Sequence, residues 1–221
     1  MARLALVSAM HEELAAVLAR MPDEQRTQVA GRDFWIGHWH GHEVVCVLSR
    51  IGKVAAASTA ALLIQRHQVD AIVFTGVAGG LGPDVQVGDA VVAEAFLQHD
   101  LDASPLFPRH VIPLDNLSRL PTDGGWRQRL QAAVVQAQRQ MAQDWPQGWQ
   151  GIDLRQAKLH QGFILSGDRF VSTRAEQLAL RTELPDALAV EMEGAAVAQV
   201  CRDHGVPFAA VRLISDRADD A

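Results

Sequence analysis

The sequence feature that most constrains the fold is an alternation between short apolar runs and longer segments with helical spacing. Residues 71–75 and 208–214 are short and apolar on both faces, as is typical of strands covered by other elements on two sides. Residues 54–64 and 192–204 are longer, and their composition and spacing predict buried helices. This order predicts an α/β protein, a three-layer sandwich in which helices flank a central mixed sheet.

The same alternation continues along the whole chain. We expect further strands at residues 4–9, 34–39, 44–48, 90–97, 159–165 and 188–190, and further helices at residues 10–21, 126–141 and 174–180. Residues 76–82 are expected to form a glycine-rich loop, and residues 100–123 a long ordered loop. Because no linker or repeat divides the sequence, residues 1–221 are expected to form one domain.

Charge and cysteine content narrow the class of partner. The formal net charge is −6 and no basic run interrupts it, so nucleic acid and anionic membranes are not expected partners. The apolar start, residues 4–7, is too short for a signal peptide or a membrane span. Cys46 and Cys201 lie far apart among apolar residues, which favours buried free thiols in a reducing compartment. We therefore expect a cytoplasmic protein.

Charged residues mark the expected carboxyl ends of strands, where ligand sites of α/β sheets lie. Glu13 lies at the edge of the apolar stripe of the first helix, although acids also favour a helix N-terminus on electrostatic grounds alone. Glu193 heads the inward stripe of the helix at residues 192–204, whereas Glu191 is interpreted as a cap. Asp216 ends an apolar strand.

Arg212 lies inside the same apolar run as Asp216, where an unpaired charge would cost several kcal/mol. It therefore needs an acidic partner or a polar ligand, and a purely structural pair is an equal alternative. The glycines of residues 76–82 allow close approach of a ligand to the backbone, but a tight turn explains them equally well. His38, His40 and His42 straddle a turn, so no metal site is expected.

Seven motifs resemble the 5′-methylthioadenosine/S-adenosylhomocysteine nucleosidase family, within the purine nucleoside phosphorylase superfamily. They occur in family order from end to end: AMHEEL (9–14), SRIGKVAAA (49–57), TGVAGG (75–80), VGD (87–89), SGDRF (166–170), AVEMEGAA (189–196) and VRLISD (211–216). The resemblance implies a phosphorylase/hydrolase-like fold and hydrolysis of the N-glycosidic bond of an adenine nucleoside. It implies no metal and no cofactor.

The resemblance also implies roles for the candidate residues. Asp216 looks like the general acid that protonates purine N7, with a pKa expected to be raised at its apolar strand end. Glu193 looks like the group that holds the ribose hydroxyls. Glu13, with Arg212 nearby, looks like the group that positions and deprotonates the attacking water. Phe170 is expected to stack on the purine, and the backbone of Val171 to read its edge.

The remaining implied contacts are apolar or come from main chain. Met192 is expected to line the sugar pocket, and Met10 and Ile51 to complete an apolar wall, with Ile51 contributed across the interface of an expected homodimer. The other implied substrate-binding positions are Val77, Ala78, Gly79 and Ser215.

Four departures from the family pattern and three alternatives accompany this resemblance. Val77 replaces a small hydroxyl residue, His11 replaces an acid at a position expected to face outward, and Arg50 replaces a small residue near the substrate loop. The chain is also expected to lack the C-terminal helix that family members carry after Asp216. The alternatives are a phosphate-dependent phosphorylase, a futalosine-type nucleosidase and a non-catalytic nucleoside-binding protein. The acidic residues 11–13 would repel phosphate, which favours water as the nucleophile.

Overall fold

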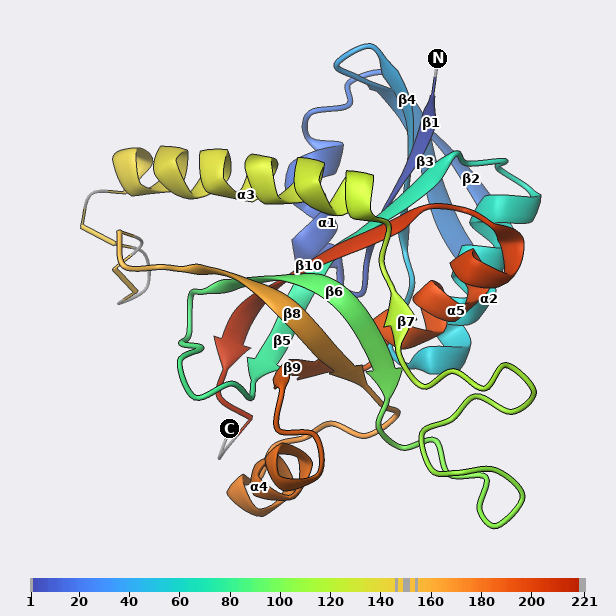
Figure 1. Ribbon diagram of the computed structural model, residues 1–221. Helices are drawn as coiled ribbons and strands as arrows, with labels where there is room; N and C mark the ends of the chain where they lie inside the picture. Colours follow the sequence, from blue (N-terminus) through green and yellow to red (C-terminus); the bar gives the residue numbers. More distant parts are fainter. Residues whose placement is uncertain (1, 146, 149–151, 154, 219–221) are drawn as a thin grey trace.

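Helices cover both sides of a mixed β-sheet in the computed structural model (Figure 1). It describes residues 2–145, 147–148, 152–153 and 155–218, without the side chains of Glu12 and Glu13. The predicted α/β class with a central mixed sheet is therefore confirmed. No helix of the described ranges is long and apolar enough to cross a membrane.

The described strands form one ten-stranded sheet in the order β10-β6-β8-β9-β5-β1-β4-β3-β2, with β7 paired to β6. Their bounds are β1 Arg3–Ser8, β2 Gln25–Val29, β3 Arg32–Trp39, β4 His42–Leu48, β5 Ala71–Gly80, β6 Ala90–Gln98, β7 Leu120–Pro121, β8 Leu159–Ser166, β9 Ala187–Glu191 and β10 Phe208–Asp216. Strand β10 pairs with β5 in parallel and with β6 in antiparallel orientation, so this half of the sheet closes on itself. As a result the carboxyl ends of β5, β8, β9 and β10 lie close together.

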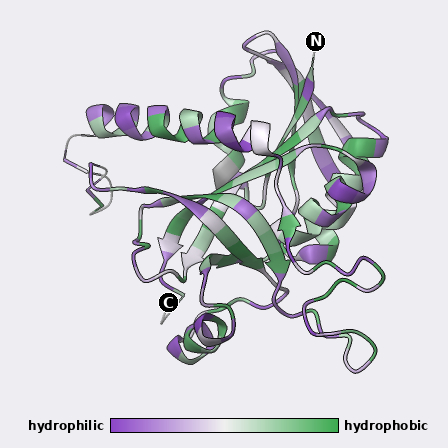
Figure 2. Cartoon of the chain, in the orientation of Figure 1, coloured by the Kyte–Doolittle hydropathy of each residue, from purple (hydrophilic) through white to green (hydrophobic). Residues whose placement is uncertain are grey.

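Five helices cover the sheet in the described part of the chain: α1 His11–Leu18, α2 Lys53–Gln65, α3 Gly124–Asp144, α4 Arg174–Glu183 and α5 Gly194–His204. Helix α2 packs beside α5, and α5 contacts β6, β8 and β10. Helix α3 lies along the outside of β6, β8 and β10 and has no buried residue, which agrees with its largely hydrophilic colouring in Figure 2. The apolar strands beneath form the core, which includes Phe74, Phe96 and Ile164.

The structure differs from the predicted elements in two places that matter. Strand β2 was not predicted, because its residues are polar and mostly exposed and only its pairing with β3 makes it a strand. Residues 76–80 were predicted as a loop but continue β5, because their backbone pairs with β10 on one side and β9 on the other. The predictions for the two thiols are confirmed, since Cys46 and Cys201 are free and buried.

Candidate active site

A pocket of about 170 Å³ lies where the carboxyl ends of β5, β9 and β10 meet. It is lined by Glu193, Asp216 and all ten residues predicted to bind substrate: Met10, Ile51, Val77, Ala78, Gly79, Phe170, Val171, Met192, Arg212 and Ser215. Ala9, Phe74, Gly76, Arg169, Val190 and Glu191 also line it. Segments that are far apart in the sequence therefore converge on one pocket whose lining is mostly apolar.

The floor of the pocket contains a buried ion pair between Arg212 and Glu191. Nη2 of Arg212 lies 2.7 Å from Oε2 of Glu191, and the two residues are 1% and 7% exposed. Nη1 of Arg212 donates to the carbonyl oxygen of Phe74 at 3.2 Å, and the guanidinium lies over the Phe74 ring at 4.2 Å. The acidic partner that Arg212 was predicted to need is therefore Glu191.

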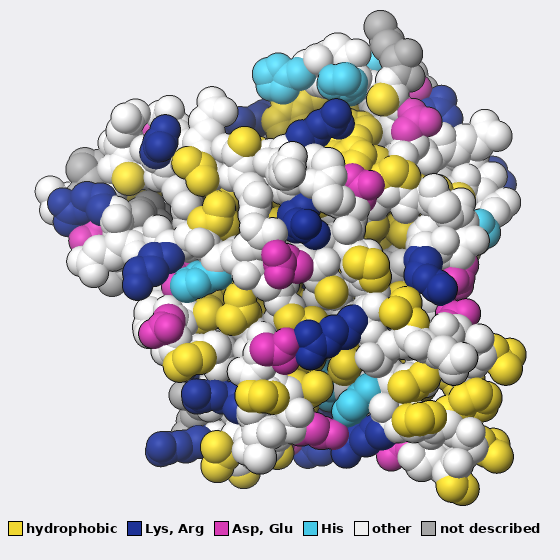
Figure 3. Space-filling model, viewed as in Figure 1, with side chains coloured by type: hydrophobic (Ala, Val, Ile, Leu, Met, Phe, Trp, Pro, Cys, Tyr) yellow, Lys and Arg dark blue, Asp and Glu magenta, His cyan; other side chains and the backbone are white. Residues whose placement is uncertain are grey.

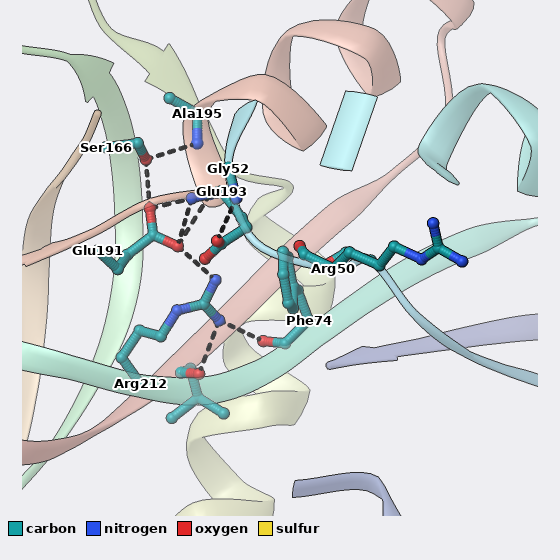
Figure 4. Close-up of polar contacts among 11 residues, drawn as sticks. Arg50, Gly52, Phe74, Ser166, Glu191, Glu193, Ala195 and Arg212 are labelled. Carbon is teal, nitrogen blue, oxygen red and sulfur yellow. Dashed lines mark hydrogen bonds and ion pairs between the residues drawn. The ribbon is translucent and has the colours of Figure 1, made fainter. Parts of the chain in front are cut away.

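Glu191 also caps the helix that follows it. Its carboxylate accepts hydrogen bonds from the amide of Gly194 at 2.9 Å and from the amide of Glu193 at 3.2 Å (Figure 4). The Ser166 hydroxyl donates to the same carboxylate and accepts from the amide of Ala195 at 2.8 Å. Because Glu191 is both the cap of α5 and the partner of Arg212, its interpretation as a cap alone was incomplete.

Glu193 is held in the pocket wall by burial and by one backbone donor. It is 6% exposed, and its Oε1 accepts a hydrogen bond from the amide of Gly52 at 2.8 Å. Burial, together with the nearby charge of Glu191, raises the pKa of Glu193 to about 7. Glu193 was predicted to lie within a helix starting at residue 192, but α5 begins at Gly194 and Glu193 is the residue before its first turn.

Asp216 lies at the carboxyl end of β10, half-buried at the pocket. Its Oδ1 accepts from the amide of Ala218 at 2.7 Å, and its Oδ2 accepts from the Ser215 hydroxyl at 2.8 Å. A Cβ atom on Gly79 would lie 3.0 Å from Oδ1 of Asp216, so the absence of a side chain at position 79 allows this close approach. The carboxylate is thus fixed between the ends of β5 and β10.

The apolar walls of the pocket are unusually open to solvent. Phe170 is 64% exposed and Ile51 is 61% exposed, although both line the pocket. Ile51 was expected to come from across a dimer interface, but it lines the pocket formed by its own chain. A large exposed aromatic ring in a pocket suits stacking on a flat heterocycle. Val77 also lies in the wall.

Three further expectations from the sequence concern Glu13, Arg50 and the histidines at residues 38–42. The role predicted for Glu13 depends on a side chain that lies outside the described residues. The Arg50 side chain donates to the carbonyl oxygen of Gly31 and does not line the pocket, and Figure 4 shows it directed away from Glu193. The Nδ1 atom of His38 lies 2.8 Å from Asp23, and no metal-binding cluster of three His, Cys, Asp or Glu residues occurs among the residues described.

Comparison with known proteins shows to which family the chain belongs. The sequence profile of the phosphorylase superfamily matches residues 3–221. The 5′-methylthioadenosine/S-adenosylhomocysteine nucleosidase of Marinomonas sp. is 35% identical over 218 residues, covering 99% of this chain and 87% of that protein. The enzyme of the same name from Geobacillus thermodenitrificans is also 35% identical, over 99% of this chain and 85% of its own length.

The chain belongs to the 5′-methylthioadenosine/S-adenosylhomocysteine nucleosidase family of the phosphorylase superfamily.

Solved structures of nucleosidases have the same fold. The Neisseria meningitidis nucleosidase in complex with methylthio-immucillin-A superposes with a TM-score of 0.83 at 31% identity, covering 99% of this chain and 87% of that chain. A Helicobacter pylori nucleosidase mutant with 5′-methylthioadenosine in its active site superposes with a TM-score of 0.82 at 32% identity, with the same two coverages. A futalosine hydrolase mutant of Helicobacter pylori has a TM-score of 0.80 at 31% identity, also covering 99% and 87%.

Glu191 and Arg169 line the pocket of this nucleosidase-family chain but were not predicted to do so from the sequence. Ser166 lies outside the pocket lining, and its hydroxyl joins β8 to α5 through Glu191 and Ala195, a role that the sequence did not predict. The available signal was a buried arginine that required a carboxylate, together with a serine ending an apolar strand. Only the pairing of β8 with β9 places Ser166 opposite Glu191.

Proposed function

We propose that this chain hydrolyses the N-glycosidic bond of 5′-methylthioadenosine and S-adenosylhomocysteine, releasing adenine and the 5-thio-substituted ribose. The observation that carries the proposal is the match to nucleosidases of this name over 99% of the chain. The pocket supports it with two carboxylates, Glu193 and Asp216, beside the exposed aromatic ring of Phe170.

In this reaction the adenine leaves as the ribose acquires oxocarbenium character. We assign the general acid to Asp216, which would give its proton to purine N7 and make adenine a better leaving group. Its carboxylate borders the pocket at the strand end, within reach of Ser215. Phe170 would stack on the purine, and the main chain of Val171 would contact its edge.

Glu193 is the group that we assign to binding of the ribose. It is buried, and its negative charge beside the ribose can stabilise a cationic transition state. With a pKa of about 7, a substantial fraction of Glu193 is ionised at neutral pH and can accept hydrogen bonds from ribose hydroxyls. Met192, the neighbour of Glu193 in the sequence, also lines the pocket and would contact the sugar.

We assign water activation to Glu13. The carboxylate of Glu191 is already occupied by Arg212 and the start of α5, so it is a poor candidate for a general base. The segment before α1 reaches the pocket through Ala9 and Met10, and Glu13 lies in the first turn of that helix. A carboxylate at this position would repel phosphate electrostatically, which favours water as the nucleophile.

The direct test is product analysis. Purified protein would be incubated with each of the two nucleosides, with and without phosphate, and the products separated by liquid chromatography. Free adenine and the corresponding free 5-thio-substituted ribose are expected in both buffers. A strict requirement for phosphate with a ribose-1-phosphate product would establish a phosphorylase, and binding without cleavage a nucleoside-binding protein.

Futalosine is the second substrate to include, because a futalosine hydrolase is among the similar structures. The ratio of kcat/KM values for futalosine and methylthioadenosine would rank the two substrates. A ratio above one would replace the proposed substrate while leaving the hydrolytic reaction intact.

We further propose a homodimer and a cytoplasmic location. Leu106 and Leu114, on the loop between β6 and β7, are 84% and 86% exposed, and hydrophobic side chains gather in this region at the lower right of Figure 3. Exposed apolar patches of this kind mark protein interfaces. Light scattering after gel filtration would give the mass of a dimer; the mass of a monomer would contradict the proposal. The buried free thiols Cys46 and Cys201 suit a reducing compartment.

A further inference from the structure

Three charged residues outside the assigned machinery form a closed cycle of hydrogen bonds beside the pocket. Nζ of Lys53 donates to Oδ1 of Asp100 at 2.5 Å, and the amide of Asp168 donates to Oδ2 of Asp100 at 2.8 Å. The amide of Lys53 in turn donates to Oδ1 of Asp168 at 2.7 Å. Each residue therefore contacts the other two, and we call these three residues the Lys53 cluster.

The cluster joins three segments that are distant in the sequence. Lys53 begins α2, Asp100 follows β6, and Asp168 follows β8. Lys53 and Asp168 are 115 positions apart. Two of the three hydrogen bonds are donated by backbone amides, those of Lys53 and Asp168. The cluster therefore fixes the main chain at the start of α2 and in the loop after β8, and not only the side chains.

The loop before α2 and the loop after β8 carry the two exposed hydrophobic residues of the pocket wall, Ile51 and Phe170. Ile51 lies two positions before Lys53, and Phe170 lies two positions after Asp168. The same first loop is also joined to Glu193 through the amide of Gly52. Helix α2 lacks a capping side chain of its own, so Asp168 supplies the acceptor at its first residue. At φ 95°, Gly52 lets the chain turn sharply beside Asp168.

The ion pair of the cluster is largely shielded from solvent. The side chains of Lys53 and Asp100 are 15% and 30% exposed, whereas that of Asp168 is 49% exposed. Burial opposes ionisation of Asp100, but the hydrogen bonds from Lys53 and from the Asp168 amide outweigh it and lower the pKa of Asp100. Asp100 therefore stays charged at neutral pH and accepts from both donors.

We propose that Lys53, Asp100 and Asp168 are positioning residues that set the spacing between the Ile51 wall and the Phe170 wall, and so determine how tightly the pocket binds an adenine nucleoside. This inference rests on the proposed function. None of the three residues lines the pocket, so they act through the loops they join. Loss of the cluster should weaken nucleoside binding more than it slows bond cleavage.

Asp100→Asn is the most informative variant, because it preserves shape and volume. An amide has one acceptor oxygen, whereas two donors face Asp100, so one contact must be lost. We expect KM for methylthioadenosine to rise about tenfold while kcat changes by less than about threefold. Asp186→Asn is the matched control, since Asp186 pairs with Arg119 at the surface away from the pocket, and its KM should not change.

Substitutions at Lys53 supply a second line of evidence. Lys53→Arg keeps a cation and should retain KM within about threefold, whereas Lys53→Met should raise it about tenfold. The Kd of a non-hydrolysable C-nucleoside analogue of methylthioadenosine, measured by calorimetry, should rise by the same factor as KM. Circular dichroism spectra and melting temperatures identify any variant that fails to fold. If a Lys53 variant does not fold, the KM and Kd of Asp100→Asn test the inference.

The outcomes separate this inference from the proposed function. If the wild type releases adenine but Asp100→Asn and Lys53→Met leave both KM and Kd unchanged, the inference is wrong and the function holds. A fall in kcat at unchanged KM and Kd would also overturn it. If the wild type releases no adenine but binds the analogue, weaker binding by the variants still supports the inference.

Discussion

Arg212 and Glu191 form a buried ion pair, with Nη2 of Arg212 2.7 Å from Oε2 of Glu191, beneath the pocket that contains Glu193 and Asp216. The pair has two structural consequences. It neutralises a cation that would otherwise be isolated in an apolar strand, and it holds the carboxylate that caps α5. It also places a negative charge beside Glu193, which contributes to the raised pKa of that residue.

Removing one partner of the pair should destabilise the protein strongly. Arg212→Met leaves the Glu191 carboxylate buried without its cation, at a cost of about 3–5 kcal/mol in the free energy of unfolding. Adding Glu191→Gln should recover part of that loss. Urea unfolding gives the values, and Asp186→Asn, which breaks an exposed pair, should cost less than about 1 kcal/mol. Equal losses for Arg212→Met and Asp186→Asn would refute this account.

Glu193 should make stability depend on pH. Its pKa is about 7 in the folded protein against 4.5 as a model value, so the folded state binds its proton more tightly than the unfolded state does. The resulting stability is fully present below pH 4.5 and is lost as the pH rises through 7. From pH 5 to pH 8, wild type should lose about 2 kcal/mol relative to Glu193→Gln.

The measurement is a pair of urea unfolding curves for wild type and Glu193→Gln at each pH. Other titrating groups are common to both proteins and cancel in the difference. A difference that does not change with pH would show that Glu193 titrates normally. The substitution should also lower kcat/KM, because the amide cannot provide negative charge beside the ribose.

Asp216→Asn tests the general acid. A side-chain amide can donate a hydrogen bond but is far too weak an acid to transfer a proton to purine N7, so kcat should fall by about 10²–10⁴-fold. The amide oxygen can still accept from the Ala218 amide, and the Ser215 hydroxyl can rotate to accept from the new amide nitrogen, so the melting temperature should change little. Asp203→Asn, on the surface of α5, is the control for activity. Retention of full activity by Asp216→Asn would remove Asp216 from the mechanism.

Gly79→Ala should impair activity through the same carboxylate. The new Cβ would lie 2.8 Å from Cβ of Ala218 and 3.0 Å from Oδ1 of Asp216, so the end of β10 must shift. We expect kcat to fall at least about tenfold, since small misplacements of a catalytic group are costly. Gly124→Ala is the matched control, because no atom lies within 4 Å of its added Cβ. Equal activity of the two variants would contradict the close approach.

Phe170→Ala should weaken binding of substrate. Stacking of a base on an aromatic side chain contributes about 1–3 kcal/mol, so the Kd of a C-nucleoside analogue should rise at least about fivefold. Because Phe170 is 64% exposed, stability should change little. Leu178→Ala, at an equally exposed apolar position of α4 outside the pocket, should leave the Kd unchanged. An unchanged Kd for Phe170→Ala would place the purine elsewhere.

The sequence determined the features that depend on local pattern. Apolar runs such as residues 208–214 and helical spacing such as that of α5 gave strands and helices close to those observed, because burial of one face or both faces leaves a period in the sequence. Glu193 and Asp216 were found because each charge stands at the end of an apolar segment. Residues 76–80 were wrongly predicted to form a loop because they are rich in glycine. Their strand conformation depends on pairing with β9 and β10, which the local sequence does not reveal.

Only the tertiary structure decided which charges meet. The sequence showed that Arg212 needs a partner, but Glu191 became that partner because β9 and β10 both end beside β5. Glu193 receives the amide of Gly52 from 141 positions away, and Lys53 reaches Asp100 across 47 positions. Local periodicity carries no information about such contacts, because they depend on strand order and register, which are set by the packing of the whole sheet.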